Sequence, residues 1–394
     1  METHKESEVL GPPDWVLLSV TVGLISLGLM MVYSSTFDLG YRLHEDPAFF
    51  FKRQMIWLGL GAVGMFIAAR IHYKHWMKLS IPIMALVLAL LIALVIFGRG
   101  RHLIGQSISP VELAKLAVIV YIGHWLASKR VEQLRRLPVG PLPFSIIVGV
   151  VAGLVMAQPD TSEAVIIVLV AAAMFFLAGA HLVQFVVAVV GGIAAFALVI
   201  RQIPMAVERL APFLNDWRNP LVSTNDQLRQ GLIALGSGGL FGLGPGSGRM
   251  SYRWLPAAHT DSIFAIIGEE LGLLGCVTVI GLFALLAYRG FQIAGRSRDP
   301  FGVLLTVGIT CWITFQAVVN MAVVTGTIPF TGIALPFVSL GGSSLVTCMV
   351  GVGIMLSVSR VAPVTGDIDD EARGVGWGNR WSRLSRTDSH RNAS

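Results

Sequence analysis

Acidic residues and one lysine stand inside or beside the apolar stretches of this sequence, where charges are rare. Glu112 and Lys115 lie three residues apart near the start of one stretch, so on a helix they share a face and can pair. Charges within membrane-type segments are energetically expensive and often functional. The spacing predicts either a substrate contact or a purely structural ion pair, and both remain open at this point.

Three further acidic residues have a similar double interpretation. Asp160 and Glu163 flank a short turn, residues 158–163 (QPDTSE), and Asp261 follows His259 and Thr260 and directly precedes an apolar stretch. A carboxylate at the start of a helix is an ordinary cap, stabilised by backbone N–H groups and the helix dipole. The alternative for each residue is a functional carboxylate, since charges beside membrane-type segments are often functional.

The run GSGGLFGLGPGSG at residues 236–248 could bring backbone close to a ligand, since glycine has no side chain. It lacks the Gly-Lys-Ser/Thr ending of a nucleotide-binding loop. Neither an HExxH motif nor a Cys/His cluster is present, so no protein-held metal site is predicted. The three cysteines, Cys276, Cys311 and Cys348, fall inside apolar stretches and imply no disulfide framework.

The composition indicates that the helices carrying these residues are surrounded by lipid. Of the 394 residues, 54% are hydrophobic and 13% are charged, with a mean hydropathy of +0.72. Soluble domains carry about 25% charged residues, so this chain has too little polar surface for a water-facing globule. The net charge of +6 does not cluster on a soluble face, which argues against a nucleic-acid partner.

The apolar stretches predict an all-α polytopic membrane protein with about ten transmembrane helices. They cover roughly residues 15–36, 50–69, 78–98, 110–128, 143–158, 163–180, 182–201, 262–288, 301–326 and 335–360. Connections 70–78, 129–136 and 289–298 are short and basic, so the positive-inside bias places them and both termini in the cytoplasm.

Four segments fall outside that regular pattern. The connection 203–262 between the seventh and eighth helices is long and extracytoplasmic, and long ordered loops are usually functional. Residues 326–344 are rich in Gly, Pro and Ser, and such broken backbone is tolerated only against protein or a water-filled cavity. Residues 1–14 form a cytoplasmic N-terminus, and residues 361–394 are predicted to be a disordered cytoplasmic tail near anionic lipid.

Taken in order, these segments resemble the SEDS family (shape, elongation, division and sporulation), and its FtsW branch more than its RodA branch. Residues 109–115 (SPVELAK) are similar to the family's QPSExxK element, and residues 158–160 match its QPD turn. Residues 236–246, 259–272 and 335–344 complete the resemblance, which covers about residues 15 to 360 as one transmembrane SEDS domain.

The resemblance implies an inverting peptidoglycan glycosyltransferase that polymerises lipid II, with Asp261 as the general base. Candidate substrate-binding residues are Glu112, Lys115, Asp160, Arg101, Gln230, His259, Thr260, Ser343 and Ser344. A divalent cation, Mg²⁺ or Mn²⁺, would help to neutralise the pyrophosphate, and no organic cofactor is implied. The implied partners are a class B penicillin-binding protein, other divisome or elongasome proteins and the lipid of the bacterial inner (plasma) membrane.

Two other functions remain open on the sequence alone. The charged residues within the apolar stretches would also suit a lipid II flippase. A non-catalytic scaffold for a transpeptidase needs none of these residues to react. Polymerisation of lipid II by the purified protein separates the three functions.

Overall fold

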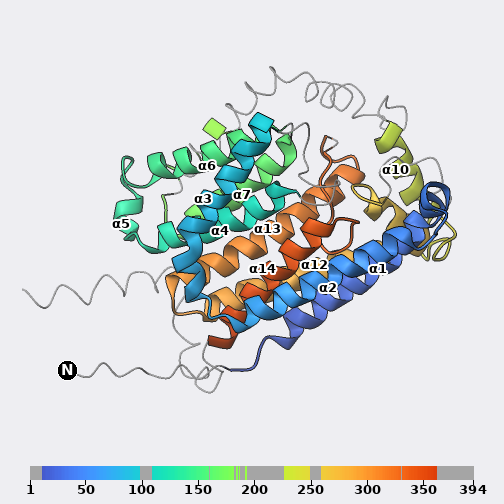
Figure 1. The fold of residues 1–394 in the computed structure, drawn as a ribbon, viewed down its shortest axis with the longest axis horizontal. Helices are drawn as coiled ribbons and strands as arrows, with labels where there is room; N and C mark the ends of the chain where they lie inside the picture. The colour runs from blue at the N-terminus through green and yellow to red at the C-terminus, as the bar shows by residue number, and fades with distance from the viewer. Residues whose placement is uncertain are drawn as a thin grey trace, which may run out of the picture.

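The computed structural model describes residues 11–97, 109–158, 160–181, 183–184, 186, 191–192, 226–248, 259–329 and 331–361. These residues form helices joined by turns and loops (Figure 1). The helices are α1 (Trp15–His44), α2 (Phe49–Arg70), α3 (Lys74–Phe97), α4 (Pro110–Ala127), α5 (Val131–Leu134), α6 (Pro141–Met156), α7 (Thr161–Leu177), α10 (Asp226–Ser237), α12 (Ile263–Arg296), α13 (Pro300–Val324) and α14 (Gly342–Val361).

The predicted all-α membrane architecture is confirmed. Six helices are long and apolar enough to cross a membrane by length and composition, namely α1, α3, α4, α12, α13 and α14, while α6 and α7 are shorter apolar helices. Together with α2, they correspond to nine of the ten predicted spans. Most of the remaining span, residues 182–201, lies outside the described residues, as do most of loop 203–262 and the segments 1–10 and 362–394.

Several predicted boundaries differ from the observed ones. Helix α1 continues to His44 and α12 to Arg296, well past the apolar stretches that define them in sequence. Helix α14 begins at Gly342 and not at 335, because residues 335–341 form turns. A methyl group on Gly342 would lie 2.4 Å from the Trp57 ring of α2. The close packing of the start of α14 on α2 therefore requires a glycine at this position.

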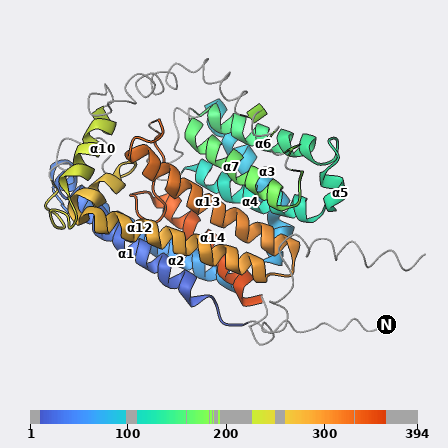
Figure 2. The ribbon, with the colours of Figure 1, turned by 180° about the vertical axis from the view of Figure 1, so that it is seen from behind.

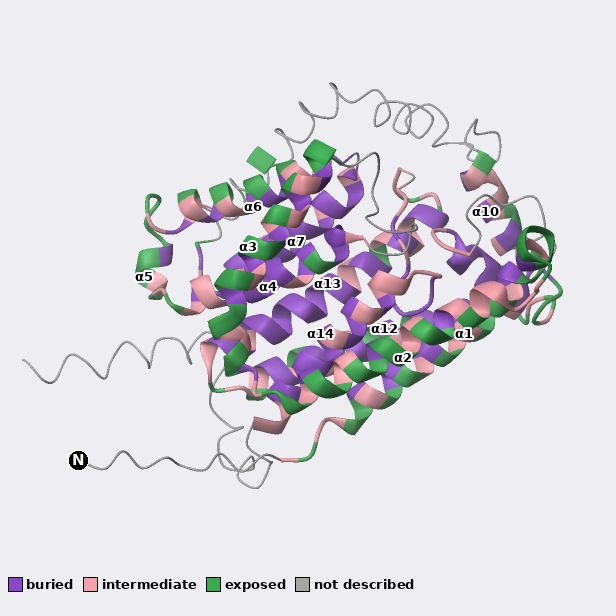
Figure 3. Ribbon diagram, viewed as in Figure 1, coloured by how far each residue is buried: buried purple, intermediate pink, exposed green. Residues whose placement is uncertain are grey.

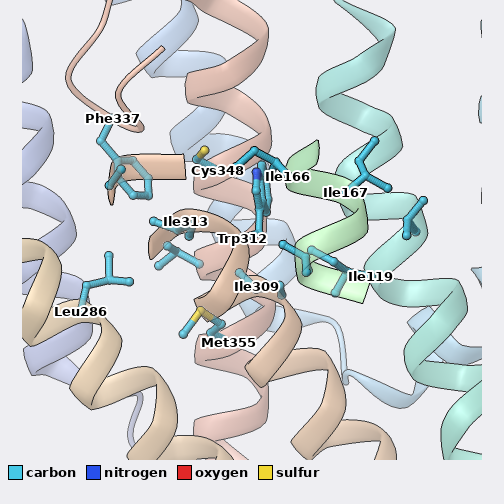
Figure 4. Packing of buried hydrophobic residues seen from close by; sticks show 14 of the residues in the cluster. Ile119, Ile166, Ile167, Leu286, Ile309, Trp312, Ile313, Phe337, Cys348 and Met355 are labelled. Atoms are coloured by element: carbon cyan, nitrogen blue, oxygen red, sulfur yellow. The ribbon is translucent and has the colours of Figure 1, made fainter. Parts of the chain in front are cut away.

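The buried centre of the bundle is formed by α4, α13 and α14, whereas α2 and α6 carry many exposed residues (Figure 3). Trp312 of α13 is fully buried and packs among Ile166 of α7 and Cys348 of α14 (Figure 4). Large apolar side chains face outward elsewhere; Phe66, for example, is 59% exposed. An apolar exterior of this kind is stable in contact with lipid tails.

The helix bundle has two ends, and Figures 1 and 2 show both of them from opposite sides. At the terminal end, comprising residues 11–14, 69–73 and 357–361, the start of α1 is tied to the end of α14. Gly11 N donates to Arg360 O at 2.8 Å, and Asp14 pairs with Arg289 at 2.6 Å. The opposite end, called here the loop end, comprises residues 44–50, 226–248, 259–262 and 325–341. The first and last described helices therefore have their outer termini on one side.

Candidate active site

Asp261 lies at the loop end, immediately before α12. The N-cap of α12 is Ser262, whose own side chain makes no capping hydrogen bond. The carboxylate of Asp261 approaches Gly332 closely, since a methyl group built on Gly332 would lie 3.0 Å from Asp261 Oδ2. The carboxylate therefore lies against the segment between α13 and α14.

Three successive carbonyl groups of the run 259–261 accept hydrogen bonds from elsewhere in the chain. Leu340 N donates to His259 O at 2.9 Å, and Ser339 Oγ donates to Thr260 O at 2.5 Å. Asn320 Nδ2 donates to Asp261 O at 2.8 Å. Since each backbone carbonyl is held, the backbone that carries the Asp261 side chain is fixed against α13 and the segment 331–340.

His259 and the residues of α10 complete the surroundings of this run. The His259 ring lies near that of Phe50, with 6.2 Å between ring centroids, and burial lowers the pKa of the imidazole below its ordinary value of 6.5. Gln227 Nε2 donates to Ser262 Oγ at 2.9 Å, which ties α10 to the start of α12. One turn further along α10, Gln230 Oε1 is buried and has no hydrogen-bond partner among the described residues.

Glu112 and Lys115 form the ion pair that their spacing suggests, but with an additional member. Lys115 Nζ lies 2.9 Å from Glu112 Oε2 and 2.8 Å from Glu163 Oε2, and all three residues are buried. The sequence offers Glu163 of α7 as a first-turn acid or a functional carboxylate, and does not indicate its pairing with Lys115. The structure thus supports the structural alternative for this pair, as an ionic triad that joins α4 to α7.

Gln316 of α13 connects the ionic triad to the segment beside Asp261. Its Oε1 accepts from Lys115 Nζ at 2.8 Å and from Trp312 Nε1 at 2.9 Å, and its Nε2 donates to Ala334 O at 3.0 Å. One helical turn later, Asn320 Nδ2 donates to Ile333 O at 2.7 Å. The two carboxamides on one face of α13 hold two adjacent carbonyls.

Gln316 and Asn320 were not among the residues predicted for the site. The available signal was their spacing of four residues within an apolar stretch, since buried polar groups in lipid-embedded helices need partners. Their partners are backbone carbonyls of a non-helical segment, and a sequence does not reveal which carbonyls such a segment turns inward.

The remaining predicted residues are placed as follows. Ser343 Oγ accepts from Ser109 N at 3.2 Å, so the start of α14 contacts the start of α4. Ser344, also in the first turn of α14, has a buried hydroxyl. Asp160 is the buried N-cap residue of α7 without a side-chain capping bond. Arg101 lies outside the described residues.

The glycine-rich run approaches the chain's own helix. Gly242 has a φ of +80°, and a methyl group on it would lie 2.2 Å from Glu270 O. Leu243 N donates to Glu269 O at 2.9 Å, and Gly244 N donates to Glu270 O at 3.0 Å. These carbonyls are free to accept because α12 departs from helical geometry at Gly272, where φ is +67°.

The Glu270 side chain is held by the same run. Its carboxylate accepts from Ser34 Oγ of α1 at 2.5 Å and from Gly246 N at 3.1 Å. The glycine-rich run therefore packs against a buried carboxylate and the non-helical turn of α12. The sequence suggested that this backbone approaches a ligand, whereas in the structure it approaches the chain itself.

A resident metal ion has no ready ligand set among these residues. Within the described part of the chain, no three His, Cys, Asp or Glu residues come together as a group that could hold one.

Comparison with known proteins identifies the family to which this fold belongs. The family model described as cell cycle protein, for FtsW, RodA and SpoVE, matches residues 15–363. The chain is 37% identical to the probable peptidoglycan glycosyltransferase FtsW of Trichlorobacter lovleyi, over 90% of this chain and 95% of that protein. It is 38% identical to the stage V sporulation protein E of Bacillus subtilis, over 91% of this chain and 99% of that protein.

Solved structures share the fold. A chain from a peptidoglycan synthase complex, studied for the coordination of polymerization and crosslinking, superposes with a TM-score of 0.70 at 27% identity, over 88% of this chain and 98% of that one. The rod shape determining protein RodA of Thermus thermophilus superposes with a TM-score of 0.64 at 25% identity, over 89% and 98%. The chain described here is a multi-pass membrane protein that belongs to the FtsW, RodA and SpoVE family, with its FtsW-like members among its relatives.

Proposed function

We propose that this chain, a peptidoglycan glycosyltransferase of cell-wall synthesis, polymerises lipid II by an inverting transfer with Asp261 as general base. The enzyme class follows from its family and from relatives named for that activity. The observation that carries the assignment of Asp261 is its place at the loop end, with its backbone carbonyl held by Asn320 and its carboxylate against Gly332.

The reaction needs one base and one leaving group. The 4-hydroxyl oxygen of the acceptor sugar attacks C1 of the donor sugar, and the bond from C1 to the pyrophosphate oxygen breaks. The hydroxyl proton passes to the Asp261 carboxylate, while undecaprenyl pyrophosphate leaves with the electron pair. Because a single displacement occurs, the configuration at C1 inverts and no covalent enzyme intermediate forms.

The neighbouring residues have supporting roles in this proposal. His259, kept neutral by its burial, can donate one hydrogen bond to a sugar hydroxyl or accept one from it, without adding charge beside the base. Gln230, with a buried Oε1 that lacks a partner, and Thr260 are further candidates to contact substrate. Glu112 and Lys115 act through the ionic triad on the position of α4 and α7, and not by contact with the reacting atoms.

A divalent cation, Mg²⁺ or Mn²⁺, would enter with the pyrophosphate. Mg²⁺ is commonly held by substrate phosphates together with one or two carboxylates, and this fits a site with Asp261 as a single acidic group better than a protein-held cage does. When bound, the ion would neutralise charge on the leaving pyrophosphate.

The orientation and partners are proposed on similar grounds. Arg70, Lys74, Arg289 and Arg296 lie near the terminal end of the bundle, which we assign to the cytoplasm of a bacterial inner membrane by the positive-inside bias. The loop end then faces outward, where lipid II is polymerised. A class B penicillin-binding protein in the divisome or elongasome is the proposed partner, supported by the resemblance to a chain of a peptidoglycan synthase complex.

In the test, purified protein and its partner are given labelled lipid II, and the glycan chains formed are measured. Asp261→Asn is compared with Asp226→Asn, which alters an exposed aspartate in α10 that pairs only with Arg229 among the ion pairs described. Wild type and Asp226→Asn should form chains, and Asp261→Asn should form none. Chains formed equally by Asp261→Asn would remove this residue from the mechanism.

The other two functions have distinct results in the same assay. A flippase would move lipid II across liposomes without forming polymer. A scaffold would do neither, yet would raise the crosslinking activity of its partner. The described structure favours the enzyme over the flippase because the buried charges of α4 and α7 are paired with one another.

A further inference from the structure

We infer that Asn320 is a positioning residue for Asp261, acting through the backbone carbonyl of Asp261. This inference rests on the proposed function, because it assigns Asn320 a part in the same reaction. Asn320 belongs to α13, whereas Asp261 precedes α12, so the contact joins two helices at the loop end across 59 residues of sequence.

The orientation of the Asn320 amide is fixed by its two acceptors. Nδ2 donates to Asp261 O at 2.8 Å and to Ile333 O at 2.7 Å, which uses both of its hydrogens. The reverse orientation would place Oδ1 against two carbonyl oxygens. Only 1% of the residue is exposed, so neither hydrogen bond competes with bulk water.

This amide joins the backbone on both sides of the Asp261 carboxylate. One acceptor is the carbonyl of Asp261 itself, and the other belongs to Ile333, next to the Gly332 that the carboxylate approaches. Ser339 and Leu340 bind the carbonyls of the two preceding residues, and Asn320 binds the carbonyl of Asp261 itself, so it contributes directly to the distance between Asp261 and the segment that it faces. Misplacing a catalytic group by about 1 Å can lower a rate by about 100-fold.

The Asn320 side chain uses both of its donors and leaves its acceptor oxygen unpaired among the described residues. Its Oδ1 is buried without a hydrogen-bond partner in the described structure. A side chain selected for stability alone would satisfy this oxygen, since buried polar atoms are nearly always paired. An unpaired acceptor on a residue whose donors are both used at the active site fits a positioning role.

The experiment compares Asn320→Leu and Asn320→His in lipid II polymerisation. Leucine keeps the approximate size and removes both donors, while histidine retains one ring N–H near the position of Nδ2. We expect kcat of Asn320→Leu to fall at least 10-fold with KM changed less than 3-fold, and Asn320→His to recover part of the loss. A merely structural role would lower the amount of folded protein, leave kcat per folded enzyme unchanged, and not respond to one restored donor.

Thr310→Val on the same helix is the matched control. Thr310 is fully buried, and its hydroxyl donates only to Thr306 O within α13 among the bonds described. Its kcat should match wild type. If Asn320→Leu does not fold, Asn320→Ala, which also removes both donors and introduces no larger side chain, should show the same loss of kcat.

The outcomes separate this inference from the function on which it rests. An Asn320→Leu or Asn320→Ala enzyme with wild-type kcat, alongside an inactive Asp261→Asn, overturns the positioning role alone. Equal losses in Asn320→Leu and Asn320→His with a matching fall in thermal stability also overturn it. Full polymerisation by Asp261→Asn would overturn the proposed function itself.

Discussion

Lys115 and Gln316 are joined by a hydrogen bond of 2.8 Å from Nζ to Oε1, which connects the buried ionic triad to the loop end of the protein. The same glutamine donates to Ala334 O, two residues beyond the Gly332 that faces Asp261. The charges within the bundle and the proposed base are therefore linked through one side chain of α13. Stability and activity should respond together when this link is cut.

Removing the lysine should destabilise the protein strongly. Lys115→Met leaves Glu112 and Glu163 buried without their shared cation, and breaking a buried pair in this way costs about 3–5 kcal/mol. Glu112→Gln should cost less, because Lys115 keeps Glu163 and Gln316. Unfolding of the detergent-solubilised variants measures both free energies. Equal stability of wild type and Lys115→Met would show that the triad contributes nothing.

Alanine substitutions at two glycines of the glycine-rich run should have different effects on the free energy of unfolding. Gly242→Ala places a methyl group 2.2 Å from Glu270 O at a positive φ, so we expect a loss of at least about 2 kcal/mol in the free energy of unfolding. Gly236→Ala, in α10 with open space around it, should be neutral or stabilising by up to about 1 kcal/mol. Thermal unfolding compares the two. Similar losses in both would contradict the packing of the run on α12.

Stability at mildly acidic pH should depend on His259. Burial holds its pKa below 6.5 in the folded state, so the unfolded chain binds the proton more readily. The free energy of unfolding should therefore be unaffected well above pH 6.5 and should fall as the pH drops from there through the lower folded pKa. His259→Gln should remove this part of the pH dependence. Superimposable pH profiles of the two proteins would contradict the buried, neutral imidazole.

Chelation should affect the reaction and leave the fold intact. If the cation enters with the pyrophosphate, EDTA should lower polymerisation while the unfolding temperature of the substrate-free protein stays unchanged. Added Mg²⁺ or Mn²⁺ should restore the rate. A clear fall in the unfolding temperature with EDTA would indicate a structural ion held by the protein.

The helical architecture was predictable because length and hydropathy decide what can cross a bilayer. The ends of the helices were less predictable, since α1 and α12 continue past their apolar stretches into packing that composition does not reveal. The start of α14 at Gly342 depends on the contact with Trp57, which is distant in sequence.

The candidate site was predictable in its charged residues and not in its carboxamides. The spacing of Glu112 and Lys115 indicated their pairing, but Glu163 joins them only because α7 packs beside α4. Asn320 and Gln316 bind carbonyls of a non-helical segment, so their roles depend on tertiary contacts. The glycine-rich run suggested a ligand, whereas its backbone packs on the broken turn of α12.

The rate of glycan polymerisation by Asp261→Asn tests the central claim most directly. The asparagine keeps the size of the side chain and cannot accept the proton of the attacking hydroxyl. With folding confirmed by an unchanged unfolding temperature, the account predicts a kcat lower by about 100-fold or more, the usual contribution of a general base. A kcat within threefold of wild type would contradict it.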